Sequence, residues 1–494
     1  MRAPPRDAWQ RAATLMALIC AFLSAVVFVR RGLAAWEAAG VAPGLAITSG
    51  CEEESFLSVW RAVHHQEAYA DAAHVPYAAT YFNWLFYAGY AVPVRSAVNR
   101  WGDAIIPRAG RIVTAVSALL GTSALFWLLW RALPQEAGLA AGLAAFAFGG
   151  PLVGWWAHTL RPDVCALAAE TAALAVLVAG WRQRPGVAVL GATLLFFAAW
   201  SCKQTNVLGL GTALLFLLGR RQWRLASILM LGSVCLWGGT LLALGPDYRA
   251  SLLSSGRNSV FILGEGLANL RDMLQKTAPF WLMGILLGCR RARASVTTPA
   301  GLPADLRLLG LLGLLVAMPA AFAAGCKLGA YSNYYFTPMV MLTCLVAGLI
   351  AIGSPSRLVF AGFTLAAGMQ LLVAVARVGQ MSQLPQAAGL AEIWAVWQPE
   401  PEPRFAAVNA LNLPWLNPGS PPFVLAYNYG SDRAAGRSFE ADGIGGLIRT
   451  GYFRSLLLPA ATGQAYDGGD LRQYTRGRSV KGLTVFNRDD HPPP

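Results

Sequence analysis

Long apolar runs separated by short polar loops occupy the first three quarters of the chain. A helix of roughly 17–25 apolar residues is long enough to cross a bilayer. The pattern predicts about eleven such spans, near residues 12–29, 109–131, 137–156, 163–180, 186–202, 205–219, 225–244, 278–289, 306–324, 336–352 and 357–378. We therefore expect an all-α polytopic membrane protein whose transmembrane domain covers residues 1–380.

After residue 380 the long apolar runs stop, and the chain becomes rich in proline, glycine and polar residues. Three short runs in this tail have the composition of strands, at residues 423–427, 455–458 and 483–486. We expect a small soluble α/β domain over residues 381–494.

The composition fits this class. Of the 494 residues, 56% are hydrophobic and 13% are charged, whereas soluble domains carry about a quarter charged residues. The net charge of +14 could indicate nucleic-acid binding, but the arginines cluster in alternate short loops, which is the positive-inside pattern of membrane proteins. We therefore exclude nucleic acid as a partner. The pattern places the N-terminus in the cytoplasm and the C-terminus outside. An outer functional face without an organelle signal fits a bacterial inner (plasma) membrane, so we expect the C-terminus in the periplasm.

Under this topology the periplasmic side receives nearly all of the unusual polar residues. It holds the long outer loop over residues 30–108, the start of the span near 163, the end of the span near 202 and the segment before the span at 336. Only this side combines length with aromatic residues, carboxylates and histidines. We therefore expect the functional site there.

The outer loop contains three consecutive carboxylates, Glu52, Glu53 and Glu54. They precede apolar residues at helical spacing, which predicts an amphipathic helix lying on the membrane surface with Glu54, Ser58 and Arg61 on its polar stripe. The carboxylates have two interpretations: charges that favour a helix start, or functional groups. The aromatic segment around Tyr81 likewise fits either an interfacial belt or a groove for a lipid or sugar.

Five further residues are predicted at ends of spans on the same side. Arg161 and Asp163 flank a proline at a helix start, Lys203 follows a span, and Asn333 precedes one together with Tyr334. Cations gathered at one aqueous boundary suit an anionic group such as phosphate, and carboxylates beside them suit acid–base chemistry.

Glu170 is predicted inside a span, two turns deeper than Asp163 on the same helix face. A carboxylate within the bilayer is usually paired or functional. We expect either an ion pair, with Arg111 as a candidate partner, or a functional role.

The histidines His64, His65, His74 and His158 fall on the periplasmic side. Their spacing matches no metal-ligand pattern, so no cofactor is certain, although a divalent metal is compatible with the composition of the site.

The order of these features resembles the GT-C superfamily of membrane glycosyltransferases, in particular members of the protein mannosyltransferase and aminoarabinose transferase type. The resemblance rests on an acidic group after the first span, an interfacial helix and a Tyr/Pro-rich segment. It continues with Arg-Pro-Asp at the start of the fourth span, a lysine at the end of the fifth and a Gly…Asn-Tyr segment before a late span. The residues that carry it are Glu52–Glu54, Trp60, Arg61, Tyr69, Pro76, Tyr77, Tyr81, Arg161, Asp163, Lys203, Gly329, Asn333 and Tyr334. The usual acidic pair begins with Asp, whereas this chain has three glutamates, so the equivalent carboxylate is left open.

The resemblance implies transfer of a sugar from a polyprenyl-phosphate carrier to a lipid, glycan or protein acceptor at the lipid bilayer. Phosphate is a good leaving group, so one base suffices for a single inverting displacement. We expect Glu53 as the base, with Glu52 next and Glu54 as the third candidate. Arg161, Lys203 and Arg61 would hold the donor phosphate, and Asp163, Asn333, Tyr334 and Tyr81 would orient groups around it. The alternatives are a transporter or flippase of a lipid-linked sugar, which only Glu170 favours, and a non-catalytic assembly or sensor protein.

Overall fold

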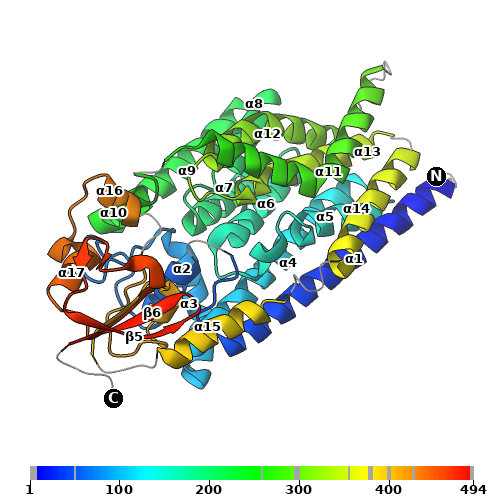
Figure 1. The fold of residues 1–494 in the computed structure, drawn as a ribbon. Helices are drawn as coiled ribbons and strands as arrows, with labels where there is room; N and C mark the ends of the chain where they lie inside the picture. The colour runs from blue at the N-terminus through cyan, green and yellow to red at the C-terminus, as the bar shows by residue number, and fades with distance from the viewer. Residues whose placement is uncertain are drawn as a thin grey trace.

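The computed structural model of the protein describes residues 8–48, 52–257, 260–293, 301–353, 356–376, 382–397, 402–425 and 429–489. Within these residues the chain is mostly helical, with a small sheet near its C-terminus (Figure 1). The helices are α1 Ala8–Val41, α2 Glu52–Val63, α3 Trp84–Trp101, α4 Ile106–Ala132, α5 Ala137–Gly149, α6 Pro162–Gly180, α7 Pro185–Cys202, α8 Leu208–Gly219, α9 Trp223–Ala243, α10 Gly245–Arg257, α11 Leu263–Arg293, α12 Leu302–Gly325, α13 Phe336–Ala351, α14 Ser356–Ala376, α15 Leu384–Val396, α16 Tyr429–Ala434 and α17 Gly443–Arg449.

Eight helical segments among the described residues are long and apolar enough to cross a bilayer. They contain α1, α4, α6, α7, α9, α12, α13 and α14. The prediction of an integral membrane protein is consistent with these segments, but the predicted number of about eleven spans is not confirmed.

The other three predicted spans fall on helices that differ from the expected ones. Helices α5 and α8 have 13 and 12 residues, which at 1.5 Å per residue is well short of a hydrocarbon core about 30 Å thick. The span predicted at 278–289 is the second half of α11, a 31-residue helix whose first half carries charged residues. Hydropathy measures the length of an apolar run in the sequence. It does not distinguish a helix that spans the membrane from a short helix that is buried among other helices.

The helices pack into one bundle. Helix α6 packs against α7, α12 against α13, and α1 against α5 and α14. At Gly310 in α12 a Cβ atom would lie 2.6 Å from Leu345 in α13, so this glycine allows the two backbones to approach closely. Helix α13 is buried along nearly its whole length, and it is the centre of the bundle.

Helix α2 is buried on both faces, unlike the amphipathic surface helix that the sequence predicts. Its apolar residues Phe56 and Leu57 are buried, and so are Glu54, Ser58 and Arg61 of the expected polar stripe. Helix α3 covers the apolar side, and the segment that precedes α3 covers part of the polar side, where Thr80 Oγ1 lies 3.0 Å from Ser58 Oγ. The prediction of an exposed polar stripe was therefore wrong, because the outer loop folds back over the helix.

The C-terminal part contains a four-stranded sheet in the order β1-β2-β6-β5. The strands are β1 Arg404–Ala406, β2 Ser455–Pro459, β5 Tyr474–Val480 and β6 Leu483–Arg488, with a two-stranded ribbon of β3 Ala465–Tyr466 and β4 Gly469–Asp470. Strand β1 is parallel to β2, and the other pairs are antiparallel. The strand predictions at 455–458 and 483–486 are confirmed. The run at 423–427 is wrong over 423–425, which form no strand, and residues 426–427 lie outside the described residues.

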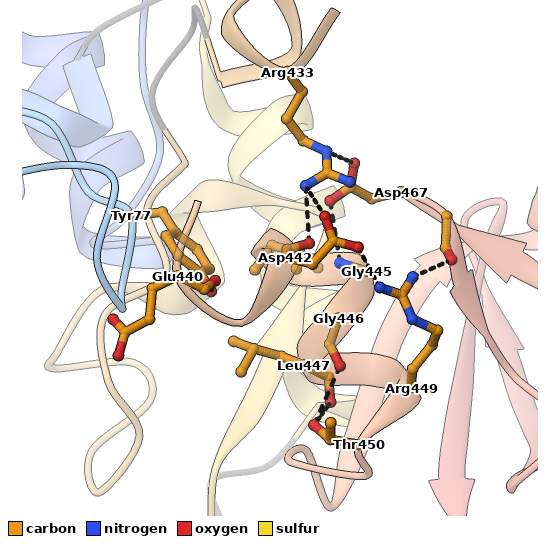
Figure 2. A network of polar contacts seen from close by, with 12 residues as sticks. Tyr77, Arg433, Glu440, Asp442, Gly445, Gly446, Leu447, Arg449, Thr450 and Asp467 are labelled. Atoms are coloured by element: carbon orange, nitrogen blue, oxygen red, sulfur yellow. Dashed lines mark hydrogen bonds and ion pairs between the residues drawn. The ribbon is translucent and has the colours of Figure 1, made fainter. Parts of the chain in front are cut away.

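The C-terminal part packs against the outer loop at one end of the bundle (Figure 1), and Figure 2 shows Tyr77 of the loop beside Glu440. The Tyr77 side chain is fully buried among Phe423, Tyr429 and Phe439, and its hydroxyl donates to the Glu440 carbonyl at 2.7 Å. Glu440 in turn accepts from the Val75 amide at 2.9 Å. The loop that precedes α3 is therefore built partly from the tail of the chain.

A polar network inside the C-terminal part stabilises the segment that follows Glu440 and leads into α17 (Figure 2). Arg433 Nε lies 2.9 Å from Asp467 Oδ1, and Arg433 also donates to the Asp442 carbonyl. Asp467 accepts from the Gly445 amide at 3.1 Å, and Arg449 forms an ion pair with Asp442. These contacts fix the start of α17 beside the loop.

Candidate functional site

Asp163, at the first turn of α6, is the centre of a buried polar cluster. Its carboxylate lies 2.5 Å from Lys203 Nζ at the end of α7 and 3.3 Å from Arg161 Nε. It also accepts from Asn333 Nδ2 at 2.6 Å, in the 3-10 turn η3 Ser332–Tyr335. Three chain segments that are far apart in the sequence therefore meet at one carboxylate, and we name these four residues the Asp163 cluster.

The Asp163 cluster has an excess of positive charge. Two cations, Arg161 and Lys203, face one carboxylate, and all four side chains are buried. The cations also lie over aromatic rings: Arg161 is 4.4 Å from the centroid of Trp156, and Lys203 is 5.2 Å from that of Tyr334. Aromatic faces attract cations and orient them, but they do not neutralise the charge. Within these four residues the positive charges therefore exceed the negative ones by one, and Arg161 also acts on the carboxyl group of Glu53.

A small cavity adjoins the cluster. Its volume is about 30 Å³, and it is lined in part by Asp163, Lys203, Asn206, Asn333 and Thr337. Such a space holds about one water molecule, which needs polar partners. The cluster is thus closely packed, with room for water but not for a sugar ring inside it.

Glu170 lies one layer deeper than the cluster, and it is not paired with Arg111. Thr337 Oγ1 donates to its carboxylate at 3.1 Å, and Asn206 Nδ2 also donates to it. The expectation of an Arg111–Glu170 ion pair was wrong because Arg111 is held by another carboxylate. Thr337 follows Asn333 by one helical turn, so a single turn contacts both acidic residues of α6.

Arg111 on α4 is paired with Glu52 in the protein interior. Glu52 is 0% exposed, and its Oε1 accepts from Arg111 Nε at 3.2 Å, from Arg111 Nη2 at 3.1 Å and from the Leu160 amide at 3.0 Å. Its Oε2 accepts from the Ile47 amide at 2.7 Å. Because these partners use both of its oxygens, Glu52 fastens the start of α2 to α4 and to the segment that leads into Arg161.

Glu53, the next residue, is in a different environment. It is half-buried, and no other side chain among the described residues hydrogen-bonds to its carboxylate. Burial raises its pKa to about 7, with a further contribution from the neighbouring Glu52, while the positive charges of Arg161 and Arg111 act in the opposite direction. A carboxyl group that titrates near neutral pH next to a cation is suited to accept a proton.

Arg61 and Glu54 are on the same helix but are not in the Asp163 cluster. Arg61 is 7% exposed, and among the described residues no carboxylate lies within 4 Å of it and its Nη1 has no hydrogen-bond partner. Burial lowers its pKa, while Tyr87 and Glu67 act in the opposite direction. The sequence grouped Arg61 with Arg161 and Lys203, whereas none of the contacts between described residues joins Arg61 to either of them.

The aromatic segment contacts residues that flank Lys203 in the sequence. Gln204, the neighbour of Lys203, donates to the Tyr81 carbonyl at 2.6 Å, while the Tyr81 side chain is buried in the apolar core that surrounds α2 and α3. Asn83 Nδ2 donates to the Trp200 carbonyl at 2.9 Å. The segment therefore braces the end of α7 that carries Lys203.

The histidines are not gathered at one place. His64 binds Asp103 at 2.9 Å, His74 lies 3.4 Å from Glu440, and His158 is buried against Phe28. Within the described part of the chain, no group of three or more His, Cys, Asp or Glu side chains is arranged to hold a metal ion.

A second buried carboxylate, Asp305, lies with its partners at the opposite end of α6. It was not among the residues predicted from the sequence. Asp305 at the start of α12 is bound by Arg182 at 2.9 Å and by Arg220 at 2.5 Å, and Trp181 donates to it at 3.2 Å. Both arginines come from loops that the positive-inside pattern assigns to the same side. The signal was present in the sequence, since Asp305 is an acidic residue at the start of a predicted span.

Comparisons with known proteins give a likeness of fold. No protein-family description and no curated protein matches the chain. Two solved structures of an oligosaccharyltransferase from Archaeoglobus fulgidus are similar to it, one in complex with zinc and sulfate and one with an inhibitory peptide and a dolichol-phosphate. Each is 12% identical with a TM-score of 0.43, and the matches cover 94% and 95% of this chain and 74% and 75% of those chains. The function proposed below is based on the Asp163 cluster and Glu53.

Proposed function

We propose that the protein is an integral membrane glycosyltransferase that moves a sugar from a polyprenyl-phosphate carrier to an acceptor on the periplasmic side. The observation that carries the proposal is the pairing of Glu53, a half-buried carboxyl group with a pKa of about 7, with the excess positive charge of the adjacent Asp163 cluster. A lipid phosphate needs cations and an acceptor hydroxyl needs a base, and Arg161 of the cluster is near enough to Glu53 to influence its pKa.

The chemistry is a single displacement. The acceptor oxygen attacks the anomeric carbon, and the bond from that carbon to the phosphate oxygen breaks with its electron pair leaving on the polyprenyl phosphate. The acceptor proton passes to Glu53. Arg161 and Lys203 stabilise the charge that develops on the leaving phosphate. Asp163 holds these two cations in place, and Asn333 holds Asp163. Tyr334 orients Lys203 through its ring.

The orientation in the membrane follows from the distribution of arginines. Arg182 and Arg220 meet at Asp305, at the end of α6 opposite to Asp163. Basic loops favour the cytoplasmic side, so the Asp163 cluster faces the periplasm of an inner membrane. In this arrangement residues 1–380 form the catalytic membrane domain and residues 381–494 form a periplasmic domain.

The direct test is turnover of labelled donors by the purified protein. We expect one member of a panel of radiolabelled polyprenyl-phosphate sugars to lose its sugar in detergent or nanodiscs, with inversion at the anomeric carbon. The lipid product, polyprenyl phosphate, and the labelled sugar product are separated by chromatography. Absence of turnover with every donor, in protein shown to be folded, would contradict the proposal and would favour a flux assay in liposomes for the transporter alternative.

The pH dependence of turnover tests the role of Glu53. Because the base must be deprotonated, the rate is expected to rise with pH and to reach half of its maximum near pH 7. The donor is a phosphate diester that stays anionic over this range, so its ionisation does not produce the same profile. A rate that is flat between pH 5.5 and 8.5 would exclude Glu53 as a base whose ionisation limits the rate.

A further inference from the structure

A groove lies between α1 and α4, away from the Asp163 cluster. Its volume is about 270 Å³, and its apolar walls include Val29 and Leu33 of α1 and Ile112 of α4. All three side chains are more than half exposed, although both helices are long and apolar enough to span a membrane. The groove therefore opens toward the lipid bilayer.

The floor of the groove carries two buried polar atoms without partners. Arg111 is 4% exposed and His158 is 3% exposed, and both line the groove. Among the described residues, Arg111 Nη1 and His158 Nε2 have no hydrogen-bond partner. Unpartnered polar atoms in a buried setting cost free energy, so an occupant that satisfies both of them is favoured.

The chemistry of these two atoms defines the occupant. Burial lowers the pKa of His158 to about 4, and the charges of Arg31 and Arg111 act in the same direction, so the ring is neutral at pH 7. The ring hydrogen-bonds to the backbone of Phe28, which leaves Nε2 as an acceptor, whereas Arg111 Nη1 is a donor. A hydroxyl group can donate to the first and accept from the second.

The mouth of the groove adds a cation. Arg108 lies one helical turn from Arg111, and its guanidinium is 4.7 Å from the ring centroid of Trp36. Among the described residues no carboxylate lies within 4 Å of Arg108. A Cβ atom at Gly40 would lie within 3.0 Å of this guanidinium, so the glycine makes room for it. The charge is thus held at the mouth of the groove and is not neutralised there.

We propose that the α1–α4 groove binds an anionic membrane phospholipid with a hydroxylated headgroup. Its phosphate pairs with Arg108, a headgroup hydroxyl bridges Arg111 and His158, and its acyl chains follow Leu33, Ile112 and Val29 into the bilayer. Neither Glu53 nor any residue of the Asp163 cluster lines this groove, so we assign the lipid and the sugar carrier to different sites. The inference does not depend on the transferase proposal.

The test uses the full-length protein in detergent with phosphatidylglycerol as the probe and phosphatidylcholine of the same acyl chains as the control. Phosphatidylglycerol is expected to raise the thermal unfolding temperature in a saturable manner. Ile112→Trp fills the groove and Arg108→Gln removes the charge, and each should raise the phosphatidylglycerol concentration at half-saturation at least fivefold. The matched controls are Leu120→Trp, which is exposed on the same helix, and Arg100→Gln, which removes another arginine that lies over a tryptophan ring.

Three results would overturn the proposal. Equal stabilisation by the two phospholipids would mean that the headgroup is not recognised. An equal response of all four variants and the wild type would mean that the lipid acts elsewhere. Displacement of phosphatidylglycerol by polyprenyl phosphate would assign the groove to the carrier instead. Because none of these readouts uses turnover, failure here and failure of the proposed transferase activity are distinguishable.

Discussion

Replacing Glu53 with glutamine is expected to lower sugar transfer by at least about 10³-fold, within the range that a positioned general base contributes. Glutamine keeps the shape of the side chain but cannot accept the proton of the acceptor hydroxyl. The measurement is the single-turnover rate with saturating donor, so that loss of the chemical step is separated from loss of binding. Donor affinity is expected to change little, because Arg161 and Lys203 remain in place.

The stability of the Glu53→Gln variant serves as a control that separates loss of the chemical step from loss of the folded state. Burial raises the pKa of Glu53 to about 7 in the folded protein, above that of an unfolded chain, so folding disfavours its charged form. The native protein binds more protons than the unfolded one between these two pKa values, and stability falls as the pH rises through that window. Glu53→Gln, which is neutral at every pH, should therefore be no less stable than the wild type at pH 8.

A parallel Glu54→Gln variant tests the choice of base, since three consecutive glutamates are present. Full activity of Glu53→Gln together with loss of activity in Glu54→Gln would move the base by one residue. Loss of activity accompanied by a lower unfolding temperature in Glu53→Gln would instead indicate a structural role.

The neighbouring substitution, Glu52→Gln, is expected to destabilise the protein by about 3–5 kcal/mol, the usual effect of removing one partner of a buried ion pair. The glutamine leaves the Arg111 guanidinium charged and buried without its carboxylate, and one side-chain oxygen must serve the amides that Glu52 now binds. Thermal or denaturant unfolding in detergent, with the wild type measured in parallel, gives the difference.

The double variant Glu52→Gln/Arg111→Met separates charge burial from lost hydrogen bonds. Removing both charges should recover a large part of the lost stability, because the unpaired cation is then absent. A single Glu52→Gln variant with unchanged stability would show that the ion pair is not important for the fold. Adjacent residues are thus expected to give opposite phenotypes, loss of chemistry at Glu53 and loss of stability at Glu52.

The sequence predicted the helices well because hydrophobic periodicity and length are local properties. The predicted count of about eleven spans is not confirmed, since α5 and α8 are apolar but short. Nor did the sequence predict that α2 is buried on both faces, because the covering segment comes from elsewhere in the loop. Burial of this kind depends on tertiary packing rather than on the pattern within the helix.

In the candidate site, too, the sequence predicted some features and not others. The sequence placed Arg161, Asp163, Lys203 and Asn333 at one boundary, and the structure brings these residues into contact. It could not assign partners, so it proposed Arg111 for Glu170, whereas Arg111 binds Glu52. Which of the two buried carboxylates pairs with Arg111 depends on the distances between helices. The periodicity of apolar residues within one helix does not determine those distances.

The burial of Tyr77 among residues of the C-terminal part has a consequence for biosynthesis. Phe439 leaves the ribosome 362 residues after Tyr77, a delay of roughly 20–70 s at about 5–20 residues per second. During that interval the outer loop lacks the aromatic residues that enclose Tyr77 and the Glu440 groups that bind it. The loop that braces the Lys203 end of α7 is therefore completed only after the last part of the chain has been synthesised, so the candidate site stays incomplete until synthesis ends.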